Sequence, residues 1–279
     1  CPVCKSSEYK RYWLVSDMIL NKCENCSIIF QEESSPALNN KELINRIYES
    51  YKGNIETHLK INQARIHKIE KTMGIKLKGM DILEIGSGNG ALAELLSKEN
   101  NYIGFEAYKI FQNEIEKNFT SLADKFFFRE FKPELIKNKK FDLIIANDVF
   151  EHIKNPLETL SYLKENLKDN GFIWIEVPDE SFIRIKGYIR IIMGIYLNGY
   201  PTNPDHRILF NKKTFRFFLE KTDLKIKRYI IDSVWGDKEK LSVVFNGKVP
   251  WYIQLLSKLL KITQTDKIIG ANITGVLTK

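Results

Sequence analysis

A buried strand that runs straight into a three-glycine turn is the feature of this chain that most constrains its fold. The stretch Asp81–Gly90 reads Asp-Ile-Leu-Glu-Ile-Gly-Ser-Gly-Asn-Gly, and its apolar run is typical of a strand covered on both faces. The glycines let the backbone turn tightly and approach a ligand without interference from a side chain: Gly86, Gly88 and Gly90. A helix from Ala91 would point its free amide groups at that ligand. The stretch therefore predicts an α/β fold with a nucleotide-type cofactor site.

Four further strand patterns follow and alternate with helical patterns. They cover residues 102–106, 126–129, 141–146 and 171–177. This alternation predicts a Rossmann-like, doubly wound and mainly parallel sheet, whose ligands bind at the carboxyl ends of the strands. We expect a linker and leading helix over residues 36–78. The core should then cover residues 79–279, with helical insertions at about 180–210 and 236–270 and a closing strand over residues 272–277.

The composition is that of an ordinary soluble protein. Hydrophobic residues make up 43% and charged residues 28% of the 279 residues, which suffice for one large domain with a small appendage. No apolar stretch approaches the roughly 20 residues that span a bilayer, because Arg184, Lys186 and Arg190 interrupt the most apolar candidate. The N-terminus carries no signal-peptide pattern, so a cytoplasmic location is expected.

The net charge of +8 is concentrated in the last third of the chain. From Ser181 onward, the chain has 18 Lys and Arg against 7 Asp and Glu. Lysine-rich faces exposed to solvent would explain this excess of positive charge without any binding partner. The functional alternatives are an anionic substrate, an anionic membrane surface or nucleic acid.

The cysteines form two Cys-x-x-Cys pairs within the first 26 residues: Cys1, Cys4, Cys23 and Cys26. This spacing predicts a structural zinc site, in which two tight turns each supply two thiolates and leave no coordination position for water. Two disulfides are the alternative, but nothing else in the chain indicates secretion. We therefore expect a small zinc ribbon over residues 1–35.

Three motifs resemble class I S-adenosylmethionine-dependent methyltransferases. The glycine spacing is Gly-x-Gly-x-Gly, not the Gly-x-Gly-x-x-Gly of dinucleotide sites, and with Glu84 ahead of it the turn is similar to the first motif of that family. The sequence Asn147–Ile153, Asn-Asp-Val-Phe-Glu-His-Ile, is similar to the loop after the family's fourth strand. The segment 205–215 is similar to its histidine-containing entry to the next helix. The resemblance covers about residues 79–231 and implies the class I fold with S-adenosylmethionine as cofactor.

The expected strand ends and the resemblance together place the cofactor. Glu106 ends the second strand, where its two carboxylate oxygens can accept both hydroxyl groups of a ribose. Glu130 and Phe131 follow the third strand and suit the amino group and the ring face of an adenine. The expected cofactor-binding residues are Glu84, Gly86, Ser87, Gly88, Gly90, Glu106, Glu130, Phe131, Asn147 and Asp148.

Two histidines are candidates for the base that a hydroxyl acceptor needs. His152 and His206 both belong to loops expected at the carboxyl edge of the sheet, and an imidazole has a suitable pKa for accepting a proton. His206 is the preferred base or substrate ligand. His152 is the second candidate or a brace of the cofactor loop, and purely structural roles stay open for both.

A cysteine ribbon joined to this core resembles a subgroup of methyltransferases found among enzymes of polysaccharide and cell-surface sugar biosynthesis. The resemblance implies O-methylation of a sugar that is linked to a nucleotide or a lipid, with residues 182–210 and the basic C-terminal part on the acceptor side. The apolar and basic helices there fit peripheral contact with the inner face of a membrane, although packed core helices show the same pattern. Carbon methylation of a nucleotide-linked deoxysugar fits the motifs equally well.

Two other classes of function remain as alternatives. An RNA methyltransferase would use the ribbon and the basic surface, but the loop after strand four lacks Asn-Pro-Pro-aromatic and the ribbon lacks a basic-aromatic stripe. With every thiol on zinc, no cysteine is left to attack a base ring, which disfavours C5-methylation. The last alternative is a non-catalytic zinc adaptor with a degenerate core, and the intact Glu84, Glu106 and glycines argue against it. The acceptor and the oligomeric state are left open.

Overall fold

The computed structural model describes residues 1–15, 17–42, 45, 49, 55–181, 202–233, 251–262 and 271–279. Within these ranges no helix is both long and apolar enough to cross a membrane. The segment 182–201, expected on the acceptor side, lies outside the described residues. Of the expected insertion at 236–270, only residues 251–262 fall within them.

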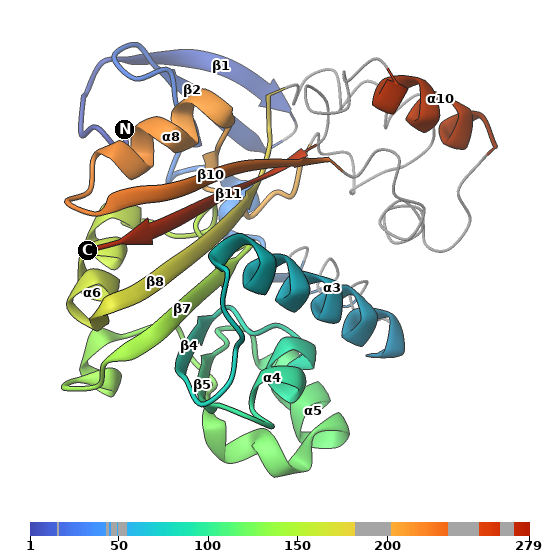
Figure 1. Ribbon diagram of the computed structural model, residues 1–279. Helices are drawn as coiled ribbons and strands as arrows, with labels where there is room; N and C mark the ends of the chain where they lie inside the picture. Colours follow the sequence, from blue (N-terminus) through green and yellow to red (C-terminus); the bar gives the residue numbers. More distant parts are fainter. Residues whose placement is uncertain are drawn as a thin grey trace.

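A seven-stranded sheet forms the centre of the fold, in the order β10-β11-β8-β7-β4-β5-β6 (Figure 1). Its strands are β4 (Asp81–Ile85), β5 (Asn101–Phe105), β6 (Phe126–Phe127), β7 (Phe141–Asn147), β8 (Leu167–Pro178), β10 (Lys225–Ser233) and β11 (Ala271–Thr278). The chain winds outward from β4 in one direction through β5 and β6, and in the other through β7 and β8. The glycine turn after β4 therefore lies at the point where the winding reverses, which is where open α/β sheets bind ligands.

Strand pairing confirms the predicted Rossmann-like, mainly parallel sheet. The pairs β4–β5, β4–β7, β5–β6 and β7–β8 are parallel. The expected closing strand is β11, which lies between β8 and β10 and is antiparallel to both. Strand β8 is longer than its apolar run predicted, because it extends back to Leu167, which pairs with Phe141.

Helices cover both faces of this sheet (Figure 1). One face carries α3 (Ile55–Met73), α4 (Ala91–Leu96) and α5 (Lys109–Asn118), and the other carries α6 (Pro156–Glu165) and α8 (Lys212–Glu220). Successive residues of β7 alternate between the two apolar cores. Leu143 belongs to the cluster that includes Ile69 of α3, whereas Ile144 belongs to the cluster that includes Leu160 of α6 and Phe215 of α8. Both faces are buried, which is why the central strands read as continuous apolar runs.

The cysteine-bearing segment forms a second sheet of four strands, in the order β1-β2-β3-β9. These are β1 (Tyr9–Val15), β2 (Met18–Cys23), β3 (Ile29–Gln31) and β9 (Ile208–Leu209). Strands β2 and β9 were not expected from the sequence. Strand β9 follows β8 in the sequence, far from the cysteine segment. It pairs antiparallel with β3, and Phe30 lies opposite Ile208.

The cysteine segment shares its apolar core with the main sheet. Val3, Ile28 and Phe30 belong to the same buried cluster as Leu83 of β4 and Phe215 of α8. The backbone N–H of Gln31 also donates to the carbonyl of Arg207 over 2.8 Å. The ribbon therefore holds the segment that carries His206 against the sheet.

The remaining described elements are short or peripheral. They are α1 (Pro36–Asn39), the 3₁₀ helices η1 (Thr120–Lys125) and η2 (Pro133–Ile136), and α10 (Trp251–Ile262). In Figure 1, α10 lies at the edge of the molecule, away from the central sheet.

Candidate active site

A cavity of about 900 Å³ opens at the carboxyl ends of β4, β5, β7 and β8. This is the edge where the sequence placed the ligand. With one exception, Gly90, the expected cofactor-binding residues line the cavity, and so do His152 and His206. Several lining residues were not singled out from the sequence: Arg65, Phe105, Tyr108, Phe111, Glu151 and Glu180.

Left-handed backbone at three glycines shapes the turn after β4, which forms one wall of the cavity through Gly86 and Gly88. Gly86, Gly88 and Gly90 have φ of 75°, 53° and 79°. A Cβ on Gly86 would lie 2.3 Å from Cγ2 of Val149, and one on Gly90 would lie 2.9 Å from Cγ1 of Ile115. Both glycines therefore allow close packing, and Gly90, which packs against Ile115 of α5, does not line the cavity. A Cβ on Gly88 would meet nothing within 4 Å, so that position faces open space.

Glu106 follows β5 and faces the glycine turn. Its two carboxylate oxygens accept the backbone N–H groups of Gly88, over 2.7 Å, and of Tyr108, over 2.8 Å. Burial raises the pKa of Glu106 to about 7, and these two backbone bonds oppose the rise. A carboxylate held in this way at the end of the second strand can accept the two hydroxyl groups of a ribose.

Buried polar groups on β4 and β5 are hydrogen-bonded to one another and to the glycine turn. Glu84 accepts a hydrogen bond from the hydroxyl of Tyr102, which also lies 3.1 Å from the hydroxyl oxygen of Ser87. Burial raises the pKa of Glu84 to about 7, while the Tyr102 bond and the charge of Arg65 oppose the rise. Tyr102 on β5 was not expected from the sequence, because it reads there as an ordinary apolar strand residue.

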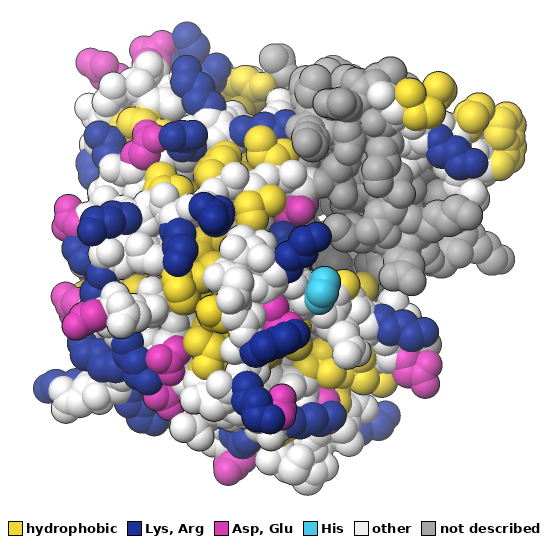
Figure 2. All heavy atoms as spheres, viewed as in Figure 1, with side chains coloured by type: hydrophobic (Ala, Val, Ile, Leu, Met, Phe, Trp, Pro, Cys, Tyr) yellow, Lys and Arg dark blue, Asp and Glu magenta, His cyan; other side chains and the backbone are white. Residues whose placement is uncertain are grey.

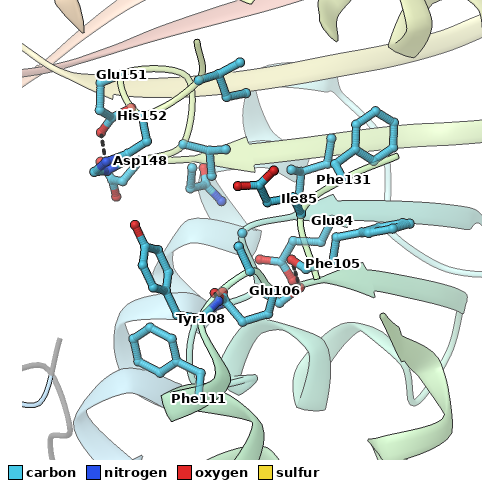
Figure 3. A pocket seen from close by; sticks show the side chains of 18 of the residues that line it. Glu84, Ile85, Phe105, Glu106, Tyr108, Phe111, Phe131, Asp148, Glu151 and His152 are labelled. Atoms are coloured by element: carbon cyan, nitrogen blue, oxygen red, sulfur yellow. Dashed lines mark hydrogen bonds and ion pairs between the residues drawn. The ribbon is translucent and has the colours of Figure 1, made fainter. Parts of the chain in front are cut away.

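Aromatic rings form an apolar wall beside Glu106. Phe131 lies edge-on to Phe105 with ring centroids 5.2 Å apart, and Phe105 stacks on Phe127 at 4.8 Å. Glu130 lines the cavity next to Phe131 and is exposed. Figure 3 shows Phe131 and Phe105 on one side of the cavity and Tyr108 on another. This arrangement can hold a planar ring against Phe131 with its polar edge near Glu130.

The end of β7 presents polar groups that the described part of the chain leaves unpaired. Asn147 is 9% exposed, and neither its side-chain oxygen nor its nitrogen has a hydrogen-bond partner among the described residues. A buried amide without partners costs about 1–3 kcal/mol, so this amide is available to a ligand or to water in the cavity. Asp148 next to it has φ of 54° and lies 3.7 Å from the guanidinium of Arg65. With Gly88 and Glu106, these groups fit a ligand that has a ribose and a polar tail.

Two imidazoles and a carboxyl group converge on the other side of the cavity. Nε2 of His152 and Nε2 of His206 each lie 4.0 Å from Oε1 of Glu151, and the two imidazole centroids are 4.7 Å apart. The sequence named both histidines, but it did not name Glu151, although Glu151 stands beside His152 in the strand-four motif. The structure brings together two histidines that are 54 positions apart.

Acidic residues face the Nδ1 atoms of these imidazoles, on the side of each ring away from Glu151. Nδ1 of His152 lies 3.2 Å from Oδ2 of Asp205, and that oxygen also accepts the hydroxyl of Tyr108 over 3.1 Å. Nδ1 of His206 lies 3.8 Å from Oε1 of Glu180. Burial favours the neutral imidazole of His152, but the Asp205 carboxylate outweighs it and raises its pKa to about 9. Burial raises the pKa of Glu151 to about 8.

Helix α3 contributes a buried ion network that the sequence did not reveal. Arg65 lies 3.3 Å from Glu176 of β8, and Lys68 donates to the same carboxylate over 2.7 Å. Burial alone would raise the pKa of Glu176, but Arg65 and Lys68 lower it to about 2. Because Arg65 also approaches Asp148, this network fixes α3 against the loop that carries Asn147 and Asp148.

The cysteines come together as the spacing predicted. Cys1 Sγ lies 3.6 Å from Cys26 Sγ, Cys4 Sγ lies 3.5 Å from Cys23 Sγ, and all four sulfurs are within 4.8 Å of one another. These distances are too long for disulfides. Four thiolates about 2.3 Å from a zinc ion would lie about 3.8 Å apart in a tetrahedron, so the cluster fits zinc.

Comparison with known proteins places the central part of the chain in a family. A family model described as a methyltransferase domain matches residues 57–228. Malonyl-[acyl-carrier protein] O-methyltransferase of Calditerrivibrio nitroreducens is 28% identical over 137 residues, which are 49% of this chain and 53% of that protein. The mitochondrial ubiquinone biosynthesis O-methyltransferase of Dictyostelium discoideum is 23% identical over 49% of this chain and 45% of that protein. The chain thus spans about half the length of these curated relatives.

Solved structures share the fold at low sequence identity. The plantazolicin methyltransferase BpumL, in complex with a pentazolic analog and SAH, has a TM-score of 0.53 at 17% identity over 86% of this chain and 91% of that chain. A SAM-dependent methyltransferase from Archaeoglobus fulgidus has a TM-score of 0.53 at 18% identity over 85% and 99%. The matched family model, the strand order and the cavity agree, and the chain belongs to the methyltransferase-domain family with a class I, Rossmann-like fold.

Proposed function

We propose that this protein transfers a methyl group from S-adenosylmethionine to a hydroxyl group of a sugar. One observation carries the proposal: Glu106 and Asn147 share a single cavity with Glu151, His152 and His206. In Figure 3, Glu106 and the aromatic wall lie apart from the corner occupied by Glu151 and His152. One part of the cavity therefore suits the cofactor, and another suits an acceptor that must lose a proton.

In the part of the cavity proposed for the cofactor, the binding groups are already in position. Glu106 would accept the ribose hydroxyls, Phe131 would cover the adenine ring, and the unpaired amide of Asn147 would meet the polar tail of the ligand. When bound, S-adenosylmethionine supplies a methyl group on a positively charged sulfur. The task left to the chain is to align the acceptor oxygen and to exclude water.

The acceptor half must receive a proton from the acceptor hydroxyl. Asp205 orients His152 in the way that a carboxylate orients the imidazole of a general base. Because Asp205 also raises the pKa of His152 to about 9, the neutral form that accepts a proton predominates only above about pH 9. His206 comes from the segment that the ribbon fixes, and it completes the group around Glu151. Both candidate bases of the sequence thus contribute to the proposed acceptor site.

The sugar acceptor is the finer part of the proposal. It is supported by the similarity of a cysteine ribbon joined to this core to enzymes of cell-surface sugar biosynthesis. The names of the curated relatives include O-methyltransferase, in agreement with a hydroxyl acceptor, but they refer to malonyl-[acyl-carrier protein] and to ubiquinone biosynthesis. Carbon methylation of a deoxysugar would use the same imidazoles to form a carbanion, and analysis of the methylated product separates the two.

A structural zinc ion in the ribbon and a cytoplasmic location at the inner membrane face complete the proposal. The four converging sulfurs support the zinc ion. Membrane contact is supported by α10, which exposes Trp251, Leu255, Leu259 and Ile262 along one side. Figure 2 shows apolar side chains gathered over α10, and elsewhere on that face it shows Lys and Arg interspersed with Asp and Glu. On the face that Figure 2 shows, such interspersion does not favour RNA binding.

The first test is calorimetric titration of S-adenosylmethionine and S-adenosylhomocysteine into the zinc-loaded protein. We expect micromolar binding that Glu106→Ala weakens sharply and that Glu116→Ala, an exposed acid on α5, leaves unchanged. Sugar nucleotides and lipid-linked sugars would then be screened for uptake of a labelled methyl group. If the intact protein does not bind either compound, the enzyme proposal fails and a zinc adaptor with a degenerate core becomes the better account.

A further inference from the structure

We propose that Glu151, His152 and His206 together hold a divalent transition-metal ion in the active-site cavity, against which the acceptor hydroxyl binds. This site is separate from the cysteine cluster, and its donors are two imidazole nitrogens and one carboxylate oxygen. The part concerning the acceptor rests on the proposed methyl transfer. Binding of the ion itself does not.

The first support is the convergence of the three donor groups. Oε1 of Glu151 lies 4.0 Å from Nε2 of each histidine, and one donor atom from each residue lies within 4.8 Å of the others. An ion with bonds of about 2.0–2.2 Å needs its donors about 3.0–3.4 Å apart, so each side chain has to move by less than about 1 Å. Rotations about side-chain bonds supply a movement of this size.

The second support is the state of Glu151. Its side chain is 1% exposed, and neither of its oxygens has a hydrogen-bond partner among the residues that the structure describes. Burying a carboxyl group without partners is costly, and proteins satisfy buried carboxylates by pairing them or by binding them to metal ions. Glu151 would bind the metal ion together with the two imidazoles beside it.

The third support is the way in which the imidazoles are oriented. Histidines that bind metals generally give their other ring nitrogen to a carboxylate, a carbonyl or a similar group. Nδ1 of His152 lies 3.2 Å from Oδ2 of Asp205 and 3.3 Å from the Asp205 carbonyl oxygen. Nδ1 of His206 lies 3.4 Å from the hydroxyl of Thr202 and 3.8 Å from Glu180. Both Nε2 atoms are thereby directed toward Glu151.

The donor set also indicates the class of ion and its use. Two imidazoles and one carboxylate suit Zn²⁺, Fe²⁺, Mn²⁺ or Co²⁺, and three protein donors leave coordination positions for a substrate. A hydroxyl group bound there ionises more easily, and because both imidazoles are then metal ligands, its proton passes to solvent water instead of to His152. The acceptor oxygen then forms the new C–O bond as the C–S bond breaks, with the electron pair staying on sulfur. An acceptor with two adjacent hydroxyl groups would bind most favourably.

Cobalt titration separates this site from the ribbon. Co²⁺ would be added to protein whose ribbon already holds Zn²⁺, and the absorption spectrum would be followed. Co²⁺ bound by imidazole and carboxylate lacks the intense thiolate-to-metal absorption that a four-cysteine site gives. We expect one Co²⁺ per chain without that absorption.

Three variants make the titration specific. Mutating a residue that only hydrogen-bonds to a metal ligand typically lowers metal affinity about 10–100-fold. Glu151 and His206 would be ligands themselves, so we expect Glu151→Gln and His206→Asn each to weaken Co²⁺ binding at least about 100-fold. Glu158→Gln, an exposed acid on α6, should bind Co²⁺ like the wild type. Glu151→Gln replaces a buried carboxyl group that accepts no hydrogen bond from the described residues, so the metal-free variant should be folded and about as heat-stable as the metal-free wild type.

Titration of S-adenosylmethionine into the same samples keeps the two proposals distinct. If S-adenosylmethionine binds but no Co²⁺ is bound outside the ribbon, or if Glu151→Gln binds Co²⁺ as tightly as the wild type, the metal site is refuted and the methyltransferase proposal stands. If Co²⁺ binds through Glu151 and His206 but S-adenosylmethionine does not bind, the metal site stands and the proposed function fails.

Discussion

Gly88 donates its backbone N–H to the Glu106 carboxylate over 2.7 Å. This bond joins the turn after β4 to the residue after β5, so two separate sequence motifs meet in one contact. The second oxygen of Glu106 accepts the N–H of Tyr108 over 2.8 Å. The carboxylate is therefore positioned before any ligand binds, which lowers the entropy lost on binding.

This contact predicts how cofactor binding depends on pH. Because burial raises the pKa of Glu106 to about 7, its carboxyl group is protonated below pH 7 and ionised above it. Ribose hydroxyls donate to the ionised form, so affinity for S-adenosylmethionine should be constant above pH 7 and fall by up to about tenfold per pH unit below it. Calorimetry from pH 5.5 to 8.5 measures this. Glu106→Gln should bind weakly with a flat profile, and a profile as steep as that of the wild type would refute the assignment.

The packing of Gly86 predicts a substitution that damages both fold and site. Gly86→Ala would put a Cβ 2.3 Å from Cγ2 of Val149 at a φ of 75°, so we expect a loss of about 2–4 kcal/mol in unfolding free energy and much weaker cofactor binding. Gly74→Ala is the matched control, since its φ is 70° but nothing lies within 4 Å of the new Cβ. It should cost about 1–2 kcal/mol.

A second substitution tests whether the contact with Val149 is the cause. Val149→Ala removes the clashing methyl group, so the double variant Gly86→Ala, Val149→Ala should recover part of the stability lost in Gly86→Ala. Denaturant unfolding of the single and double variants provides the measurement. Equal losses in Gly86→Ala and Gly74→Ala would show that the backbone angle, not the packing, dominates.

Removal of the zinc ion that we propose for the ribbon should affect the candidate active site through strand pairing. Gln31 of β3 donates to the carbonyl of Arg207, next to His206, over 2.8 Å. A strong chelator, or Cys23→Ser, should release β3 and increase hydrogen exchange at residues 29–31 and 207–209, while β4 and β7 stay protected. Unchanged protection at 207–209 in chelated protein would show that β9 is held without the metal.

The ion network of α3 predicts a stability effect at the wall of the cavity, which Arg65 lines. Arg65→Ala leaves Glu176 with one cationic partner and takes the nearby charge from Asp148. We expect a loss of about 2 kcal/mol, less than the 3–5 kcal/mol typical of a buried carboxylate left with no partner, because Lys68 remains. Thermal and denaturant unfolding measure it, with Lys60→Ala on the exposed side of α3 as the control. Adding Glu176→Gln to Arg65→Ala should restore stability, and a further loss would contradict the role of the network.

Local patterns in the sequence were enough for the central sheet and for half of the cavity. Burial on both faces produces the apolar runs of β4, β7 and β8, and left-handed backbone favours glycine at position 86. Each of these features can therefore be recognised from a short stretch of consecutive residues. Glu106 could be named because parallel strands bring their carboxyl ends to one edge. The short strands β2 and β9 were missed because they carry no extended pattern and depend on the pairing partner.

The sequence by itself determined the parallel sheet, the glycine turn and the pairing of cysteine turns, because each depends on the spacing of residues close together in the chain. Only the tertiary structure decided which distant groups meet. Arg65 reaches Glu176 across 111 positions. His152 and His206 both approach the Glu151 carboxyl group, and the backbone N–H groups of Arg207 and Ile208 donate to the Glu151 carbonyl. Such contacts follow from how helices and strands pack in space, and no periodicity along the chain specifies them.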